Sequence, residues 1–358
     1  MQARILGSAA GGGLPQWNCR CANCAAARAG LAHVRPRTQS SVAVSADGRA
    51  WFLLNVSPDI RQQILAFPAL GPSDGTAPRG TALHGTTPRD TAPRGTAPRG
   101  SGIAGCVLTD AEIDHTAGLL FLREGGAGCV CCTSTVRRWL NRWFPIEPIL
   151  ASFPNPPASI PKTQHSFPST LASFPRTTWR DLPLDAACEL CLPDGSPSGL
   201  RVHAFEVARH VPRFVNDCQG SDERPDDEDS AAGSVVGLRI NDTKTGGQLV
   251  YAPCVGSFDE PLKHAAREAD CLLVDGTFWD DDEPIRCGIG SRTARTMGHL
   301  PVGGPEGSLS WLSGLSARPR VYVHINNTNP MLDERGPEHR QVTDRGIRVG
   351  ADGDNFEL

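Results

Sequence analysis

The sequence lacks the features that would place it in a membrane or nucleic-acid-binding class. It has no uninterrupted apolar run of about 18 residues, the length that crosses a bilayer, and no N-terminal succession of basic, apolar and small residues. Its 35 Lys and Arg residues against 39 Asp and Glu give a net charge of −4, so it has no basic excess for polyanion binding. We therefore expect a cytoplasmic protein with no membrane span and no nucleic-acid partner.

The composition that is present favours a large globular core. The chain has 358 residues, of which 39% are hydrophobic. It contains 13 cysteines, but only Cys19, Cys21 and Cys24 form a tight cluster, and the group within 129–132 is too closely spaced for an ordinary disulfide framework. In a reducing compartment we expect most of the remaining cysteines to be small core residues.

Three segments are rich in residues that interrupt helices and strands. Residues 72–101 contain repeats of a Gly-Thr-Ala-Pro-Arg unit, 151–176 contain repeated Ser-Phe-Pro, and 219–233 are acidic and polar. Gly and Pro break regular structure, and these segments offer little apolar surface to pack. We predict that all three are flexible insertions on the surface of a single domain spanning 1–358.

Outside these segments, strand-like patterns outnumber helix-like ones. Strands are expected at 3–8, 41–44, 50–55, 103–108, 200–207, 235–240, 248–251, 271–274 and 320–325. Helices are expected at 58–65, 116–123, 135–143, 261–268 and 306–315. Short strands in groups, with helices between the groups, favour an α/β fold of layered sheets (α+β layers) covered by helices over a doubly wound parallel sheet.

A cysteine cluster indicates a structural metal site. Cys19, Cys21 and Cys24 follow a C-x-C-x-x-C pattern, which lets three thiolates reach one tetrahedral zinc ion. No fourth ligand is nearby in the sequence, and His299 or His324 could supply it from a distant loop. The alternative is a trio of buried or redox-active cysteines. We expect structural Zn²⁺ here.

A second pattern indicates a different kind of metal site. In the stretch LTDAEIDHTAGLL, Asp110, Glu112 and Asp114 alternate before His115. If these residues leave a strand, alternation places the three carboxylates on one side, where a divalent cation would relieve their repulsion. The alternative is a polar helix N-terminus capped by Thr109. The spacing alone leaves both interpretations open.

The order of motifs along the chain resembles one protein family. It runs SAAGGGLPQWNCRCANC, VSPDI, TDAEIDHTAGL, YAPC, LLVDGTFWDDDE, MGHLPVGGPEGSL and HINNTNP. This series is similar to that of the pyrroloquinoline quinone (PQQ) biosynthesis protein B family, PqqB, a branch of the metallo-β-lactamase fold superfamily. The resemblance implies a metallo-β-lactamase-like αββα sandwich with its metal site at one edge of the two sheets.

The resemblance also implies an altered active-site metal loop. The superfamily loop H-x-H-x-D-H, which binds two zinc ions in hydrolases, matches Asp110, Glu112, Asp114 and His115, so carboxylates replace two histidines. Oxygen ligands favour iron, manganese or magnesium over a zinc pair. We expect one active-site metal, Fe²⁺ with Mn²⁺ or Zn²⁺ as alternatives. By the resemblance, His115, Asp114 and His324 would hold it, with help from Asp110 or Glu112.

Three further residues match positions of the superfamily. Asp275 and His299 resemble the acid and histidine pair that delivers a proton to the leaving group in related phosphodiesterases, so we predict that both are catalytic. Cys254 stands where hydrolases of this fold carry a metal-bridging aspartate. It could bind the metal or fill space.

The resemblance implies a role in PQQ biosynthesis. Our first hypothesis is a non-haem iron oxygenase that hydroxylates the tyrosine ring of a peptide-derived, crosslinked Glu-Tyr precursor. The alternative is a soluble carrier that helps to transport PQQ or its precursor to the periplasm. A residual phosphodiesterase or lactamase is disfavoured because the two-zinc ligands are substituted. The expected partners are PQQ or that precursor and other PQQ biosynthesis proteins, with a homodimer left open.

Overall fold

The computed structural model describes residues 1–72, 101–124, 127–153, 177–184, 186–212, 214–215, 231–317 and 319–358. The three predicted insertions, 72–101, 151–176 and 219–233, therefore lie almost entirely outside the described residues. The start of the second one is described, and it is helical to Ser152.

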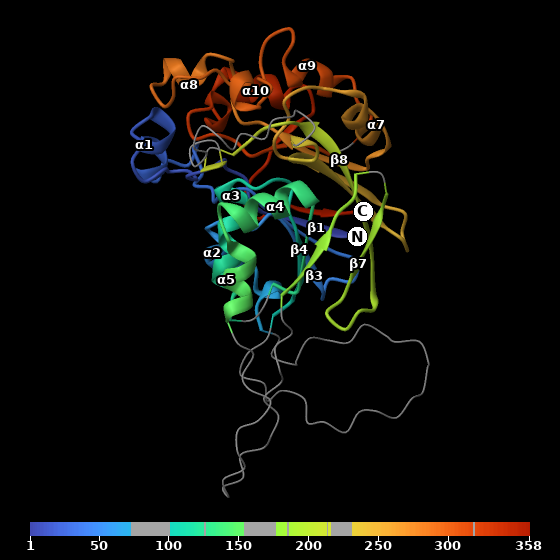
Figure 1. The fold of residues 1–358 in the computed structure, drawn as a ribbon. Coiled ribbons are helices and arrows are strands. Elements are labelled where there is room, and N and C mark those ends of the chain that lie inside the picture. Colours follow the sequence, from blue (N-terminus) through green and yellow to red (C-terminus); the bar gives the residue numbers. More distant parts are fainter. Residues whose placement is uncertain are drawn as a thin grey trace, which may run out of the picture.

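Two seven-stranded mixed sheets lie at the centre of the molecule (Figure 1). The strand order of the first is β14 (Asn355–Glu357), β1 (Gln2–Gly7), β2 (Ser41–Ser45), β3 (Trp51–Leu54), β4 (Ile103–Val107), β5 (Cys129–Cys132) and β6 (Thr178–Asp181). That of the second is β13 (Arg348–Val349), β12 (Arg320–Val323), β11 (Cys271–Asp275), β10 (Gln248–Ala252), β9 (Val235–Asp242), β8 (Pro197–Ala208) and β7 (Cys188–Cys191). Neighbouring strands are parallel from β3 to β6 and from β10 to β13, and antiparallel elsewhere.

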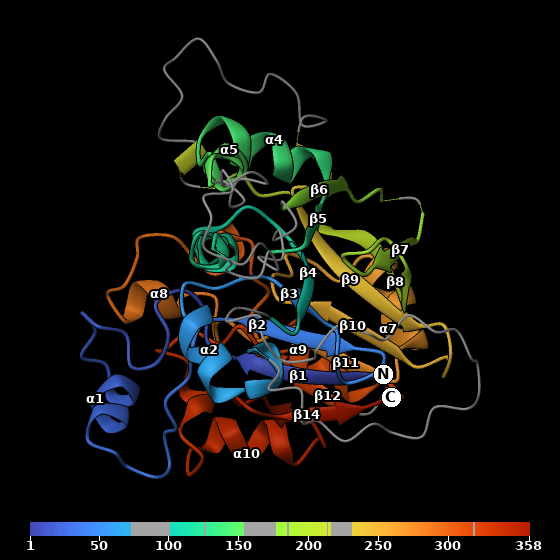
Figure 2. The ribbon, with the colours of Figure 1, turned by 90° about the horizontal axis from the view of Figure 1, so that it is seen from below.

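Helices cover the outer face of each sheet (Figures 1 and 2). Those packed on the first sheet are α2 (Ile60–Ala66), the 3-10 helix η2 (Ala117–Leu122), α4 (Ser134–Arg142) and α5 (Ile146–Ser152). Those packed on the second are α1 (Ala22–Arg28), α7 (Glu260–Glu268), α9 (Ser308–Ser313) and α10 (Pro337–Thr343). The remaining short elements are η1 (Pro68–Leu70), α3 (Ile113–Thr116), α8 (Glu283–Arg286), η4 (Arg295–Met297) and η5 (Pro330–Leu332).

Alternation along the strands builds three apolar layers. Phe52 and Leu54 of β3 face the layer between the sheets, whereas Leu53 faces the helices on the first sheet. On β11, Leu273 faces inward and Leu272 packs against the helices of the second sheet. Burying each such side chain contributes about 1.5–3 kcal/mol of hydrophobic stabilisation. The predicted αββα sandwich is confirmed.

One predicted helix has a different form. The segment expected as a helix at 116–123 is the end of α3 followed by the 3-10 helix η2. The amide of Gly118 donates to the carbonyl of Val56, and a Cβ on Gly118 would lie only 2.1 Å from the carbonyl oxygen of Ser57. The chain is therefore held against the loop after β3, and it does not continue as a regular α-helix.

None of the helices in the described ranges is both long and apolar enough to cross a membrane.

Candidate metal centres

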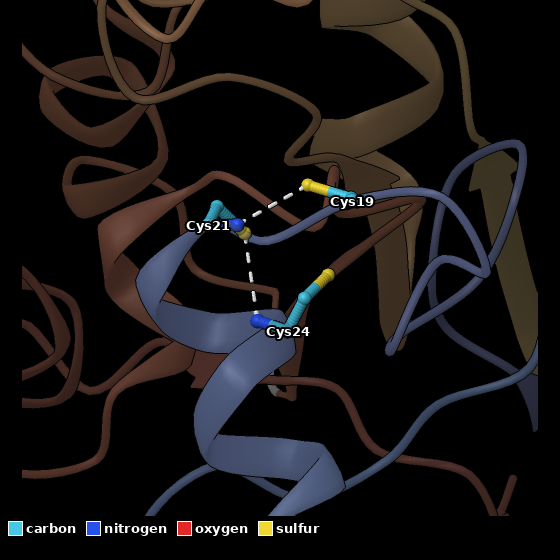
Figure 3. Close-up of side chains that lie close together, drawn as sticks. All are labelled: Cys19, Cys21 and Cys24. Carbon is cyan, nitrogen blue, oxygen red and sulfur yellow. Dashed lines mark hydrogen bonds between the residues drawn. The ribbon is translucent and has the colours of Figure 1, made fainter.

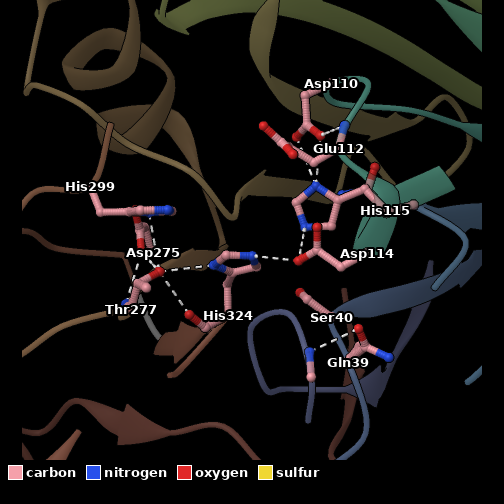
Figure 4. Close-up of polar contacts among 12 residues, drawn as sticks. Gln39, Ser40, Asp110, Glu112, Asp114, His115, Asp275, Thr277, His299 and His324 are labelled. Atoms are coloured by element: carbon pink, nitrogen blue, oxygen red, sulfur yellow. Dashed lines mark hydrogen bonds and ion pairs between the residues drawn. The ribbon is translucent and has the colours of Figure 1, made fainter. Parts of the chain in front are cut away.

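Loops at the carboxyl ends of strands from both sheets bring the predicted site residues together. The segment after β4 carries Asp110 and His115, Asp275 is the last residue of β11, and His324 directly follows β12 (Figure 4). His299 lies in the loop after η4. We call this group, together with Glu112, Asp114, Cys254 and Thr277, the histidine–carboxylate site.

Asp110 holds the ring of His115 from one side. Nδ1 of His115 lies 2.9 and 2.8 Å from the two carboxylate oxygens of Asp110, so it donates to them and leaves Nε2 to bind either a proton or a metal ion. Burial alone would lower the pKa of His115, but the negative charges of Asp110 and Asp114 raise it to about 9. His115 therefore binds a proton at neutral pH unless another cation takes the proton's place.

The other ring nitrogen of His115 fits a metal ligand. Nε2 is buried and has no hydrogen-bond partner among the described residues. It faces Asp114, whose Oδ2 lies 3.9 Å away and also lies 3.4 Å from Nε2 of His324. One ligand atom each from His115, His324 and Cys254 lies within 4.8 Å of the others. An unpartnered buried nitrogen beside these donors is the arrangement that a metal ion would complete.

Thr277 fixes the orientation of His324. Its Oγ1 lies 2.6 Å from Oδ1 of Asp275 and 2.8 Å from Nδ1 of His324. If the hydroxyl donates to the carboxylate, Nδ1 of His324 donates to the hydroxyl, and Nε2 remains an acceptor. Burial lowers the pKa of His324, and the charges of His115 and His299 lower it further against the effect of Asp114. His324 is therefore a neutral imidazole, the form that binds metals.

Asp275 and His299 form a buried pair beside His324. Nδ1 of His299 lies 2.8 Å from Oδ2 of Asp275, which also accepts from the amide of Val255. Burial would lower the pKa of His299, but the charge of Asp275 and this hydrogen bond raise it. Asp275, His299 and His324 also form a group whose ligand atoms lie within 4.8 Å of one another. The pair can therefore hold a proton or contribute to a metal site.

Glu112 lies next to a residue that sequence reasoning did not identify. Its Oε1 is 3.7 Å from Nε2 of His210, which follows β8, and both side chains are partly exposed. Burial, together with the charges of Asp110 and Asp114, raises the pKa of Glu112 to about 7. A histidine two residues after the end of a strand was the available signal for His210. Glu112 can therefore carry a proton near neutral pH.

A turn, and not strand alternation, gathers the acidic residues. β4 ends at Val107 and α3 begins at Ile113, so the strand geometry expected for this stretch is absent. The alternative of a helix capped by Thr109 is also wrong. The Thr109 hydroxyl instead donates to Asp110 at 2.7 Å and accepts from Nδ2 of Asn55 at 2.8 Å. Thr109 therefore supports Asp110, which in turn supports His115.

Two residues at this site have a left-handed backbone. Asn55 has φ 62° and His324 has φ 54°, and no other non-glycine residue in the described ranges has positive φ. This conformation costs about 1 kcal/mol or more for a side chain other than glycine. The surrounding contacts therefore hold the histidine in a position that its backbone does not favour.

The three clustered cysteines converge at the start of α1 (Figure 3). The amide of Cys21 donates to Sγ of Cys19, and Sγ of Cys21 caps α1 by accepting from the amide of Cys24, each at 3.4 Å. The three sulfurs lie within 4.8 Å of one another. Burial and the neighbouring thiols raise the pKa of Cys24 to about 12, so a cation is needed before all three become thiolates. We call these residues the thiol cluster.

The side chain of Asn327 lies against all three sulfurs of the thiol cluster. Its side-chain Nδ2 lies 3.1 Å from Sγ of Cys19 and 3.4 Å from Sγ of both Cys21 and Cys24. Zinc bonds of about 2.0 Å to oxygen and 2.3 Å to sulfur place tetrahedral ligand atoms about 3.5 Å apart. A half-turn of the Asn327 side-chain amide would bring its oxygen to the place of Nδ2, where it could bind a metal ion.

The histidines predicted to supply this fourth ligand lie elsewhere. His299 and His324 are grouped with Asp275, and Asn327 takes the position above the sulfurs instead. Sequence reasoning missed Asn327 because an asparagine in the stretch HINNTNP gives no signal as a metal ligand. Its place three residues after His324 was the only cue.

Comparisons with known proteins identify the family. Residues 50–325 match the family described as beta-lactamase superfamily domain. Over 358 residues, covering all of both chains, the protein is 41% identical to "Coenzyme PQQ synthesis protein B" of Pseudomonas savastanoi pv. phaseolicola. The chain belongs to the PqqB family. The PqqB-family protein of Azotobacter vinelandii is also 41% identical over the full length of both chains.

A solved PqqB structure supports the same assignment. The crystal structure of Zn²⁺-bound PqqB from Methylobacterium extorquens is 35% identical, with a TM-score of 0.76 and complete coverage of both chains. A diphosphatase of the PhnP family is 18% identical with a TM-score of 0.58, which shows a shared fold. The expectation of a PqqB-family member on a metallo-β-lactamase fold is confirmed.

Proposed function

We propose that this chain acts in PQQ biosynthesis as an iron- and oxygen-dependent hydroxylase of the tyrosine ring in the crosslinked Glu-Tyr precursor. Membership of the PqqB family supports the pathway. The observation that carries the reaction class is the buried, unpartnered Nε2 of His115, with Asp114 between it and His324. Two imidazoles and one carboxylate are the ligand set of non-haem Fe²⁺ oxygenases, which leave coordination positions open.

Each residue of the site has a separate task in this proposal. His115, Asp114 and His324 would hold the iron, which when bound supplies oxygen activation. Asp110 and Thr277 orient the two imidazoles through their Nδ1 atoms. The Asp275 carboxylate accepts from Nδ1 of His299, so this buried pair would hold or deliver a proton at Nε2 of the imidazole.

Cys254 has a supporting place in the site. Burial and the nearby carboxylates Asp110 and Asp275 raise its pKa well above the usual value, so it is a neutral thiol in the protein without metal. It lies with His115 and His324, which supports its assignment to the metal pocket. A neutral thiol there would be a weak ligand and would mainly fill the space that an aspartate occupies in hydrolases.

We also propose that the thiol cluster holds a structural zinc ion with the side-chain oxygen of Asn327 as fourth ligand. Three thiolates and one neutral amide complete a tetrahedron and leave no open position. Metal analysis of purified protein tests whether zinc occupies the thiol cluster and iron the histidine–carboxylate site. We expect about one zinc per chain that resists mild chelation and one iron that exchanges.

The decisive test of the reaction is an anaerobic reconstitution. The protein is loaded with Fe²⁺, mixed with the crosslinked Glu-Tyr precursor, and then exposed to oxygen, and the product mass is measured. A mass gain of one or more oxygen atoms supports hydroxylation, and protein loaded with zinc alone is the control. Unchanged product mass, with tight binding of PQQ to metal-free protein, would support the carrier function instead.

A further inference from the structure

Strand β5 carries a pair of thiols that belongs to neither metal centre. Cys129 and Cys131 are two residues apart on β5, so their side chains point to the same face of the sheet. Their sulfurs lie 3.8 Å apart. Both pack in the layer between the two sheets, whereas Cys132 packs on the opposite face under the helices.

The neighbouring strand β6 surrounds this pair with groups that favour a thiolate. Thr178 is the register partner of Cys129, and Arg180 is the register partner of Cys131. Nη1 of Arg180 donates to Sγ of a third cysteine, Cys191 on β7, at 3.3 Å. The positive charge of Arg180 therefore lies among three sulfurs at the edge where β6 and β7 approach.

The two thiols of the pair differ in exposure and in acidity. Cys129 is partly exposed, whereas Cys131 is 8% exposed. Hydrogen bonds from the Cys131 thiol and from Thr178, with the charge of Arg180, lower the pKa of Cys129 to about 6 against the effect of burial. The accessible thiol is therefore the nucleophilic one, and its buried neighbour is placed to react second.

We propose that Cys129 and Cys131 form a reversible oxidation site, which a small disulfide such as oxidised glutathione converts into a disulfide within β5. The Cys129 thiolate attacks one sulfur of oxidised glutathione and expels the other half as a glutathione thiolate. The Cys131 thiol then loses its proton and attacks the Cys129 sulfur, which expels the second glutathione. Two protein thiols are oxidised and one glutathione disulfide is reduced to two thiols.

Strand geometry permits this bond and makes it easy to reduce. Residues two apart on a strand have Cα atoms about 6.6 Å apart, at the upper end of the range of about 4.4–6.8 Å found for disulfides. The sulfurs have to close from 3.8 Å to about 2.0 Å. A disulfide at the limit of its geometry is strained and readily reduced, which suits a reversible site better than a permanent crosslink.

A single tryptic peptide tests the proposal. Cleavage after Arg123 and Arg137 releases residues 124–137, which contain Cys129, Cys131 and Cys132. Fully reduced protein is incubated with oxidised glutathione, alkylated and digested. We expect the peptide to carry one alkyl group, at Cys132, in place of three, and dithiothreitol to restore all three. A lasting glutathione adduct on Cys129, or a Cys129–Cys191 disulfide, would overturn the assignment.

Two variants and one rate comparison sharpen the test. Cys131→Ser should stop at the glutathione adduct on Cys129, whereas Cys191→Ser should still form the disulfide. In reduced protein at neutral pH we expect Cys129 to be alkylated about tenfold faster than Cys287, although Cys287 is the more exposed thiol. Faster alkylation of Cys287 would show that exposure alone sets reactivity and would overturn the proposal.

Discussion

The loop after β12 contributes a residue to each of the two candidate metal centres, but the two centres are assembled in opposite ways. The thiol cluster draws three donors from six consecutive residues, and Asn327 closes it. The histidine–carboxylate site draws His115, His299 and His324 from three separate segments of both halves of the chain. The first site is nearly complete in the local sequence, whereas the second exists only once both sheets have packed.

The donors differ as much as the assembly. The thiol cluster offers soft sulfurs with a neutral amide above them, which suits a closed zinc site that stabilises the fold. The histidine–carboxylate site offers imidazoles and carboxylates around the unpartnered Nε2 of His115, which suits an open, reactive metal. Loss of the first should mainly affect folding, and loss of the second should mainly affect chemistry.

The largest effect on activity is expected from removing a metal ligand of the histidine–carboxylate site. His324→Ala should lower substrate-dependent oxygen consumption by more than about 100-fold, because an orienting partner alone is worth about 10–100-fold and His324 is a direct ligand in our proposal. Zinc content should stay near one per chain. Oxygen electrode and metal analysis measure both. His264→Ala, at an exposed histidine on α7, is the matched control, and normal turnover in His324→Ala would refute the hydroxylase assignment.

Loss of a ligand from the thiol cluster should lower the stability of the fold. Cys21→Ser removes a zinc ligand and should lower the free energy of unfolding by about 4 kcal/mol, with loss of zinc, because a structural metal contributes folding energy. Denaturant unfolding and zinc analysis check this. The exposed Cys287→Ser should change stability by no more than about 0.5 kcal/mol. Retention of both zinc and stability in Cys21→Ser would remove the structural role.

A smaller effect at the histidine–carboxylate site is expected from a residue that orients a metal ligand but does not bind the metal itself. Asp110→Asn keeps the shape of the side chain but loses the charge that fixes Nδ1 of His115. We expect iron affinity to fall by about 10–100-fold, measured by competition with a chelator, while the zinc content is unchanged. Asp194→Asn, in an exposed turn, should have no effect. If Asp110→Asn bound iron as tightly as the control Asp194→Asn, Asp110 would not act through His115.

The smallest effect is expected above the thiol cluster. Asn327→Ala should lower zinc affinity about tenfold, because water would replace the amide oxygen, whereas Asn327→Asp should retain it. Cobalt substituted for zinc reports the change of ligand through its visible spectrum. An unchanged spectrum and affinity in Asn327→Ala would show that the amide only hydrogen-bonds to the sulfurs.

Residues that carry strong chemical signals could be predicted from the sequence. The short continuous apolar runs at β3 and β11 predicted the strands, and the order of motifs predicted the αββα sandwich and the family. The structure also brings Asp275 next to His299 and His324 next to Asp114. Their roles as catalytic and metal-binding residues stay predictions, since proximity does not establish chemistry.

Residues with weak signals could not be predicted. Thr277 and Asn327 carry common side chains, and their importance depends on contacts with residues far away in the sequence, such as Cys19. Strand β5 was missed because three cysteines in four residues do not show the β-branched pattern of a strand. The 3-10 form of η2 depends on a tertiary hydrogen bond to Val56, which no local pattern reports.

The short span from His324 to Asn327 has a consequence for the order of maturation. Only Ile325 and Asn326 separate His324 of the histidine–carboxylate site from Asn327, which contacts the thiol cluster. Asn23 and the three sulfurs already hold Asn327, and zinc bound there would add a further anchor next to the unfavourable backbone of His324. If our proposal holds, we expect zinc to be acquired first and iron second, so that iron binding would depend on an earlier supply of zinc.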